Sequence, residues 1–118
     1  VICDDFRGRA LSVLRPEMKK VVPSRDMFKL DISHPVFHSF YDLQSLVMEP
    51  PYMDDRFLGG GPEFWGLNDS EGRLVMVANH NNDLGEYMEA LDHGERPLKW
   101  SALSIRLMVN YLVYAMTR

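Results

Sequence analysis

The last part of the chain, residues 98–116, predicts a helix that is apolar around most of its circumference. At 100° per residue, Lys99, Arg106, Asn110 and Thr117 fall on one narrow polar line. A helix with such a narrow polar stripe is covered on most sides. It must pack on a sheet and also touch a further layer, a segment outside this sequence or a second subunit. We therefore expect a layered fold, with a protein partner or a homo-oligomer at this helix as open alternatives.

Three shorter elements open the chain. Residues 1–3 are apolar and stop at two aspartates, which predicts the end of a buried strand. Residues 10–22 have the apolar spacing of a helix, although Pro16 places the start of its regular part nearer residue 14. Residues 27–32 alternate between apolar and polar side chains, which indicates a second strand.

The middle of the chain predicts a hairpin between two irregular segments. Residues 64–67 and 73–79 are apolar runs that flank a polar turn, which favours a β-hairpin. Residues 48–62 are rich in proline and glycine and predict a long loop. Residues 79–97 are polar and irregular, with a short helical piece near residues 87–91. The order strand, helix, strand, hairpin and helix predicts an α/β sheet.

Composition excludes several classes of protein. The 118 residues suit one domain, and 13 basic against 17 acidic residues give a net charge of −4. That balance argues against nucleic-acid binding by phosphate neutralisation. The single cysteine, Cys3, excludes an internal disulfide. No segment predicts a membrane span or a signal peptide, so we expect a cytoplasmic protein, or an exported one whose signal lies upstream.

Asp4 and Asp5 follow directly on the first strand. The carboxyl ends of strands face the ligand crevice in open α/β sheets, so this pair could hold a metal or act as acid and base. The alternative is a turn or helix cap, because aspartate accepts hydrogen bonds from free backbone N–H groups. Both interpretations stay open, and both residues are catalytic candidates.

His34 and His38 stand four residues apart, a spacing that would let a regular helix ligate zinc. Pro35 favours an extended backbone at His34, and no glutamate stands where a metalloprotease helix carries one. A histidine that anchors a turn by hydrogen bonds is the favoured interpretation, and we assign no metal ligand. His34 remains a third catalytic candidate.

A polar string, residues 79–86, follows the second strand of the hairpin. It lacks the oxygen-ligand spacing of a calcium loop. As a strand-end loop it would line the same crevice as Asp4 and His34, although ordinary irregular loops use the same residue types. The candidate ligand-binding residues are Asp42, Asn79, His80 and Asp83.

Two features predict structure rather than chemistry. Residues 59–62 are not followed by Lys-Ser or Lys-Thr, so they indicate a flexible linker and not a phosphate loop. Cys3 stands inside a strand and no nucleophile elbow is present, which favours a buried structural thiol.

The order of several short motifs resembles a bacterial family. The motifs are VICDDF at residues 1–6, MKKVVP at 18–23, HPVFHSFYD at 34–42, WGL at 65–67, GRL at 72–74, NDLG at 82–85 and VNYLVYAMT at 109–117. Together they resemble the C-terminal half of the bacterial domain-of-unknown-function family 4159, over essentially the whole chain.

This resemblance implies a flavodoxin-like three-layer α/β sandwich, similar to that of class I glutamine amidotransferases. Residues 1–118 would then be the C-terminal part of a single domain, with a hairpin and a closing helix. Asp4, Asp5 and Asp83 match the pattern of the family. Amidotransferases use a cysteine at a nucleophile elbow with a downstream His-Glu pair, and this sequence has neither, so Cys3 inherits no catalytic role. The resemblance implies no particular reaction or cofactor.

Three functions remain open at this level. The first is a non-catalytic domain that binds a small ligand or a partner protein at the strand-end crevice. The second is a hydrolase for a small polar or carbohydrate-like substrate, with or without a metal. Asp4 or Asp5 would be its base, assisted by His34 or His80. The third is a structural subunit of an assembly.

Overall fold

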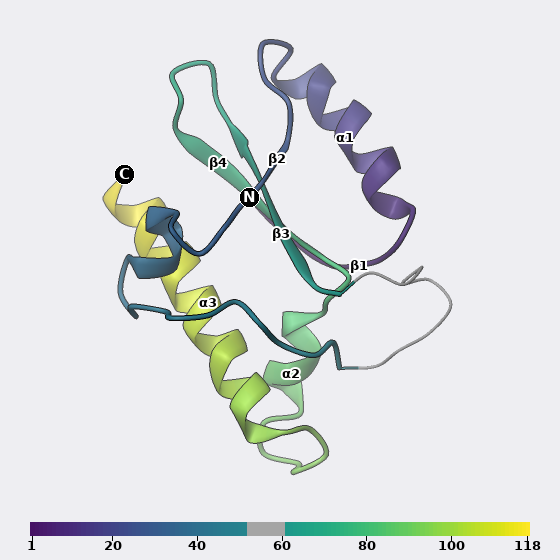
Figure 1. Ribbon diagram of the computed structural model, residues 1–118, viewed down its shortest axis with the longest axis vertical. Helices are drawn as coiled ribbons and strands as arrows, with labels where there is room; N and C mark the ends of the chain where they lie inside the picture. Colours follow the sequence, from purple (N-terminus) through teal and green to yellow (C-terminus); the bar gives the residue numbers. More distant parts are fainter. Residues whose placement is uncertain (52–60) are drawn as a thin grey trace.

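One mixed sheet of four strands organises the chain. The computed structural model describes residues 1–51 and 61–118, and its strand order is β1-β4-β3-β2 (Figure 1). Strand β1 (Ile2–Phe6) runs parallel to β4 (Leu74–His80). Strand β3 (Glu63–Asn68) pairs antiparallel with β4 on one side and with β2 (Phe28–Lys29) on the other. The predicted hairpin and the α/β class are therefore confirmed.

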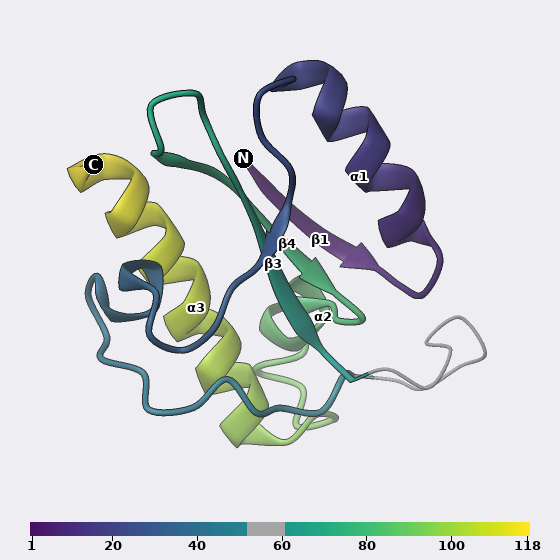
Figure 2. The same ribbon diagram turned by 45° about the horizontal axis from the view of Figure 1, so that its top comes forward.

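Helices cover both faces of this sheet. Helix α1 (Ala10–Val21) lies on one face, as Figure 2 shows. The long α3 (Leu98–Thr117), the short α2 (Leu84–Glu89) and the 3-10 helix η1 (Pro35–His38) lie on the other. In the part of the chain that the structure describes, no helix is long and apolar enough to cross a bilayer.

Strand β4 divides its side chains between the two faces. Met76 and Ala78 are buried in the cluster that faces α1, whereas Val77 belongs to the cluster under α3. Successive residues of a strand point to opposite faces, so this alternation makes β4 the shared wall of both clusters. The cluster under α3 is the larger one and consists of Leu30, Val36, Phe37, Leu43, Met48, Phe64, Val77, Leu84, Tyr87, Leu107 and Tyr111.

The predicted end of the first strand at residue 3 is wrong. Strand β1 continues to Phe6, because its register against β4 shifts between Cys3 and Phe6 and pairing then resumes at His80. The strand is also half-buried at the edge of the sheet rather than fully buried. A register shift of this kind is a β-bulge, which turns the side chains at a strand end to new directions.

The predicted strand at residues 27–32 is shorter than expected. Only Phe28 and Lys29 form the β2 ladder, because a turn follows in which Asp31 accepts a hydrogen bond from the backbone N–H of Ser33. The predicted apolar side nevertheless faces one cluster, in which Leu30 is buried and against which Phe28 and Ile32 pack. Alternation therefore indicated which residues face the interior but not where the ladder ends.

The helix predicted at residues 10–22 is confirmed, with Pro16 inside it rather than in its first turn. Pro16 lies on the exposed side of α1, where solvent can reach the carbonyl that loses its donor. The short piece predicted near residues 87–91 begins three residues earlier, at Leu84, because Asp83 caps it.

The predicted closing helix is confirmed as α3, but its polar line does not face solvent throughout. Asn110, expected on that line, is fully buried, whereas Leu112 and Met116 are exposed. The buried amide of Asn110 binds the backbone after η1, a tertiary contact that helical periodicity does not encode. Most of the loop predicted at residues 48–62, including the glycines 59 and 60, lies outside the described residues.

Candidate functional site

Two aspartates occupy the bulge at the end of β1. Asp5 has a backbone φ of 57°, in the left-handed region that side chains other than glycine rarely adopt. The bulge and this conformation direct Asp4 toward the start of α2. Because β1 and β4 are parallel, their carboxyl ends meet at one edge of the sheet, as expected for a strand-end site.

Asp4 serves as a tether between β1 and α2. Its Oδ1 accepts hydrogen bonds from the backbone N–H of Leu84 at 3.0 Å and from the side-chain amide of Asn79 at 3.2 Å. Its Oδ2 accepts one from the backbone N–H of Gly85 at 2.9 Å. Three donors on one carboxylate match the capping alternative that the sequence left open for this residue. Asp4 is therefore a positioning residue.

Asn79 links this tether to the helix on the sheet. It is fully buried, and its Oδ1 accepts the hydrogen bond of the Tyr111 hydroxyl at 2.8 Å. That bond orients the amide so that its Nδ2 faces Asp4. Tyr111 is buried in α3, and burial together with the charge of Asp4 raises the pKa of its hydroxyl well above the ordinary value. Tyr111 thus stays a neutral donor.

Asp83 caps the first turn of α2. Its Oδ1 accepts a hydrogen bond from the backbone N–H of Glu86 at 2.9 Å. Burial raises the pKa of Asp83 from 3.8 to about 6, and the neighbouring charges of Asp5 and Asp4 and a hydrogen bond with Asp5 act in the same direction. Asp83 and Asp5 therefore form a carboxyl pair in which Asp83 ionises less readily than an ordinary aspartate.

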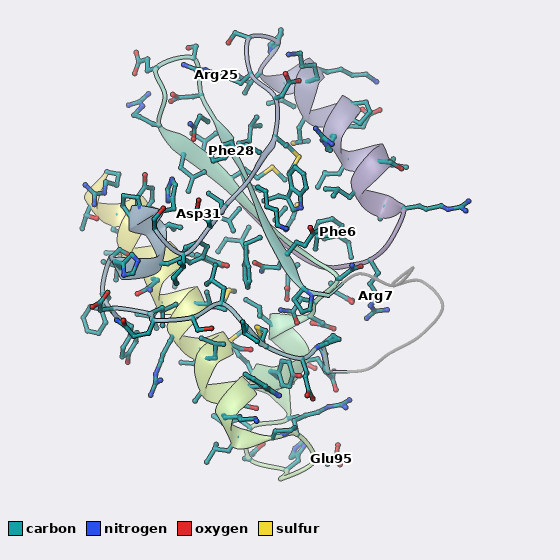
Figure 3. All side chains as sticks on the ribbon, viewed as in Figure 1. Phe6, Arg7, Arg25, Phe28, Asp31 and Glu95 are labelled. Atoms are coloured by element: carbon teal, nitrogen blue, oxygen red, sulfur yellow. The ribbon has the colours of Figure 1, made fainter. Side chains whose placement is uncertain are left out.

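Asp5 has a cationic neighbour on its own strand end. Arg7 places its guanidinium Nη2 2.8 Å from Asp5 Oδ1, and the Arg7 side chain is buried whereas that of Asp5 is largely exposed. Figure 3 shows Phe6 and Arg7 together at this end of β1. The loop after Arg7 is fixed by Asn81, whose side-chain oxygen accepts a hydrogen bond from the backbone N–H of Gly8 at 2.8 Å.

His80 ends β4, and both of its ring nitrogens have partners other than Asp5 and Asp83. Its Nδ1 lies 3.0 Å from Glu63 Oε1, and its Nε2 lies 2.9 Å from the carbonyl of Gly8. The ring also packs against Phe6 at a centroid distance of 5.4 Å. His80 thus joins β3 to the loop after β1.

The structure does not bring His34 to the carboxyl pair. Its Nδ1 accepts a hydrogen bond from the backbone N–H of Val36, and its ring packs against Phe28 and Tyr114 near the end of α3. Burial lowers the pKa of this imidazole. The interpretation of a histidine that anchors a turn is confirmed for His34. Figure 3 shows Asp31, next to this region, well apart from Arg7.

Asp42 also lies away from the carboxyl pair. Its carboxylate binds the Nδ1 of His38, whose Nε2 donates to the carbonyl of Ile32. Both contacts raise the pKa of His38. His34 and His38 therefore have separate partners and share no ligand position.

Sequence reasoning missed Tyr111, Arg7 and the role of Asp83 as a cap. The spacing of Asp83 and Glu86, followed by apolar Tyr87, is the capping-box pattern that marks a helix start. No comparable local signal marks Tyr111, since its partner Asn79 is 32 residues away. Cys3, predicted to be a buried thiol, is only half-buried, and this burial raises the pKa of the thiol.

The arrangement provides carboxyl oxygens and one exchangeable proton. Among residues 1–51 and 61–118, no three His, Cys, Asp or Glu side chains are grouped to hold a metal ion. The carboxyl group of Asp83 can accept a hydrogen bond, donate one when it is protonated, or lose its proton in favour of a cationic group.

Fold and site together define a mixed α/β domain with aspartates at the carboxyl ends of two parallel strands. A family model described as Domain of unknown function (DUF4159) matches residues 1–116, so the chain belongs to this family. The predicted family membership is confirmed. Comparisons with curated proteins and with solved structures found no match.

Proposed function

We propose that this chain is a ligand-binding domain whose site is the carboxyl pair of Asp5 and Asp83. The observation that carries the proposal is the place of Asp83, half-buried beside the carboxyl group of Asp5, where its pKa is raised to about 6. Partial burial of Asp83 beside the charges of Asp5 and Asp4 raises the free energy of its ionised form, and a ligand that offers hydrogen-bond donors or a positive charge relieves it. We infer a small ligand that carries hydroxyl or ammonium groups.

The surroundings of the pair support binding over covalent chemistry. Asp4 is occupied by three hydrogen-bond donors, and both ring nitrogens of His80 have partners. Neither is placed to activate a nucleophile without breaking these bonds. Asp4, Asn79 and Tyr111 instead form a rigid support for the start of α2, which sets the position of Asp83. Rigid support of a site lowers the entropy cost of binding.

Titration of the whole chain with a panel of small monoamines and polyols tests the proposal. We expect one chemical class to shift the amide NMR signals of Leu84 and Gly85 and to lose its effect in Asp83→Asn. Asp26→Asn is the matched control, because Asp26 is an exposed carboxylate paired only with Lys19 in the described structure. If no panel member perturbs Leu84 and Gly85, or if Asp83→Asn binds equally well, the proposal is wrong.

A hydrolase is the second candidate, and the pKa of Asp83 is the observation that favours it. A carboxyl group that titrates at about 6 can work as a general acid or base near neutral pH. The base would then be Asp5 or Asp83 rather than Asp4, without help from His34. Turnover of a nitrophenyl ester or glycoside that disappears in Asp83→Asn would favour this candidate over binding alone.

The finer fold relationship is also a proposal. We infer a flavodoxin-like, amidotransferase-like ancestry from the motif resemblance, supported by helices on both faces of the sheet and by the parallel pairing of β1 with β4. This likeness concerns the fold, and it assigns no amidotransferase chemistry to the chain.

A further inference from the structure

An exposed aromatic pair stands beside α3. Phe40 and Tyr41 follow η1, and their rings meet edge to face with centroids 5.0 Å apart. Phe40 is 65% exposed and Tyr41 is 38% exposed. Aromatic side chains supply much of the binding energy at protein interfaces, and two of them exposed together are costly without a partner.

The backbone of this pair is fixed by α3. The buried side chain of Asn110 accepts hydrogen bonds from the backbone N–H groups of Phe40 at 3.1 Å and Tyr41 at 2.8 Å. It also donates one to the carbonyl of Tyr41 at 2.9 Å, and the Ser39 hydroxyl donates to the Asn110 carbonyl at 2.6 Å. The pair is therefore held in place before any partner arrives, which lowers the entropy cost of association.

One strip of α3 continues the aromatic surface. Arg106, Val109, Val113 and Met116 follow one another at spacings of three or four residues, so they share a side of the helix. The guanidinium of Arg106 lies 5.8 Å from the centre of the Tyr41 ring, and Met116 is 84% exposed. We call this set the α3 surface, and it consists of Phe40, Tyr41, Arg106, Val109, Val113 and Met116.

The charge around the α3 surface is positive. Lys99, Arg106 and Arg118 are the charged residues of α3 and its end, and residues 96–118 contain no aspartate or glutamate. Asp42, the acidic residue next to the aromatic pair, is already bound by His38. The chain as a whole carries −4, so this local excess of cations opposes the overall balance.

We propose that the α3 surface binds an amphipathic helix of a partner protein. This helix carries acidic residues on either side of its apolar face. Charge complementarity selects this occupant, because acidic groups would meet Arg106 and Lys99, which lie on one line along α3. Pairing of α3 with a second copy of itself would bring four cations, Lys99 and Arg106 of each copy, to one interface without an acid on either helix. The 20 residues of α3 span about 30 Å, enough for a partner helix of similar length.

A pair of designed peptides tests the proposal on the whole chain. One is a 20-residue amphipathic helix with leucines on one face and glutamates flanking them, and the other has lysines in place of the glutamates. We expect the glutamate peptide to bind more tightly, as measured by fluorescence anisotropy. Arg106→Glu should weaken it about tenfold and strengthen the lysine peptide, and Phe40→Ala should weaken both. Lys20→Glu on α1 is the matched control and should change neither affinity.

Three outcomes would overturn the proposal. Equal affinity for the two peptides would show that charge does not select the partner. A concentration-dependent mass in sedimentation that Arg106→Glu abolishes would assign the surface to a second copy. Binding to phosphatidylglycerol vesicles that Arg106→Glu abolishes, without peptide binding, would assign it to a membrane. If Arg106→Glu alters the circular dichroism spectrum, Arg106→Gln replaces it in the same measurements.

Discussion

Tyr111 donates its hydroxyl hydrogen bond to the side-chain oxygen of Asn79 at 2.8 Å, inside the cluster between α3 and the sheet. This bond fixes the amide of Asn79, which in turn donates to Asp4. A residue of the closing helix thereby sets the geometry of the carboxylates at the strand ends.

Removal of the Tyr111 hydroxyl should weaken both the fold and the site. Tyr111→Phe leaves the buried oxygen of Asn79 without a donor, which we expect to cost about 1–3 kcal/mol in the free energy of unfolding. Urea denaturation measures the loss, and Tyr114→Phe, one turn along the same helix, is the control with an expected change below about 0.5 kcal/mol. Equal stability of Tyr111→Phe and the wild type would contradict this network.

Substitution of Asp4 should lower the free energy of unfolding at least as much as substitution of Tyr111. Asp4→Asn keeps the shape but loses the charge that attracts the N–H groups of Leu84 and Gly85, and its NH₂ group then faces donors. We expect a loss of about 1.5–3 kcal/mol, together with faster amide exchange at Gly85. Asp26→Asn is the control, because its ion pair with Lys19 is exposed. Unchanged exchange at Gly85 would show that Asp4 does not hold α2.

Asp83 should contribute a stability that is lost as pH rises, which is the opposite of the usual behaviour of an aspartate. The pKa of this group is raised in the folded state from 3.8 to about 6, so folding favours its protonated form. Its contribution to stability is fully present below about pH 4 and is lost as pH rises through 6. Because Asp83 is only half-buried, screening by solvent limits the effect to about 1 kcal/mol.

Asp83→Asn isolates this contribution, since asparagine also caps helices but does not ionise. Thermal unfolding of both proteins should show the variant gaining stability relative to the wild type between pH 4 and pH 7. A constant difference across that range would mean that Asp83 titrates normally. The carboxyl ¹³C chemical shift of Asp83 measures its pKa directly.

A side chain at Gly66 should crowd the leucines that pack against it. An added Cβ would stand 2.8 Å from Leu74 Cδ1 and 3.2 Å from Leu30 Cδ2. We expect Gly66→Ala to cost about 1–3 kcal/mol through overpacking. Gly61→Ala is the control, because a Cβ there meets no described atom within 4 Å. If calorimetry gives both variants the same Tm, the packing between β3 and its neighbours is looser than described.

Helices and strands that have a local signal in the sequence could be predicted from it. Two apolar runs that flank a polar turn predicted the hairpin, and helical spacing predicted α1 and α3. The place of Asp4, Asp5 and Asp83 after two predicted strands also predicted that these residues lie close together. The two strands are β1 and β4, which are parallel neighbours in the sheet. Pairing of these strands across more than 70 residues brings the three together.

Positions that depend on long-range contacts could not be predicted from the sequence. Nothing near Asn110 in the sequence shows that its side-chain amide binds the backbone of Tyr41. Helical periodicity therefore assigned Asn110 to the solvent side of the helix. His34 was expected near Asp4 because both adjoin predicted strands. It lies elsewhere because the β2 ladder ends at Lys29 and a turn leads the chain away to η1. Side-chain hydrogen bonds, rather than apolar patterns, decided these positions.

The tether between Asp4 and α2 has a consequence for the order of folding. Asp4 and Gly85 are separated by 81 residues, and β1 pairs with the distant β4, whereas β3 and β4 are joined by a short turn. Closing the long loop costs more chain entropy than forming the hairpin. We therefore expect β1 to dock after the hairpin and α3 have assembled. The aspartates would then come together in the final step, so the chain acquires its acidic site only when it is otherwise folded.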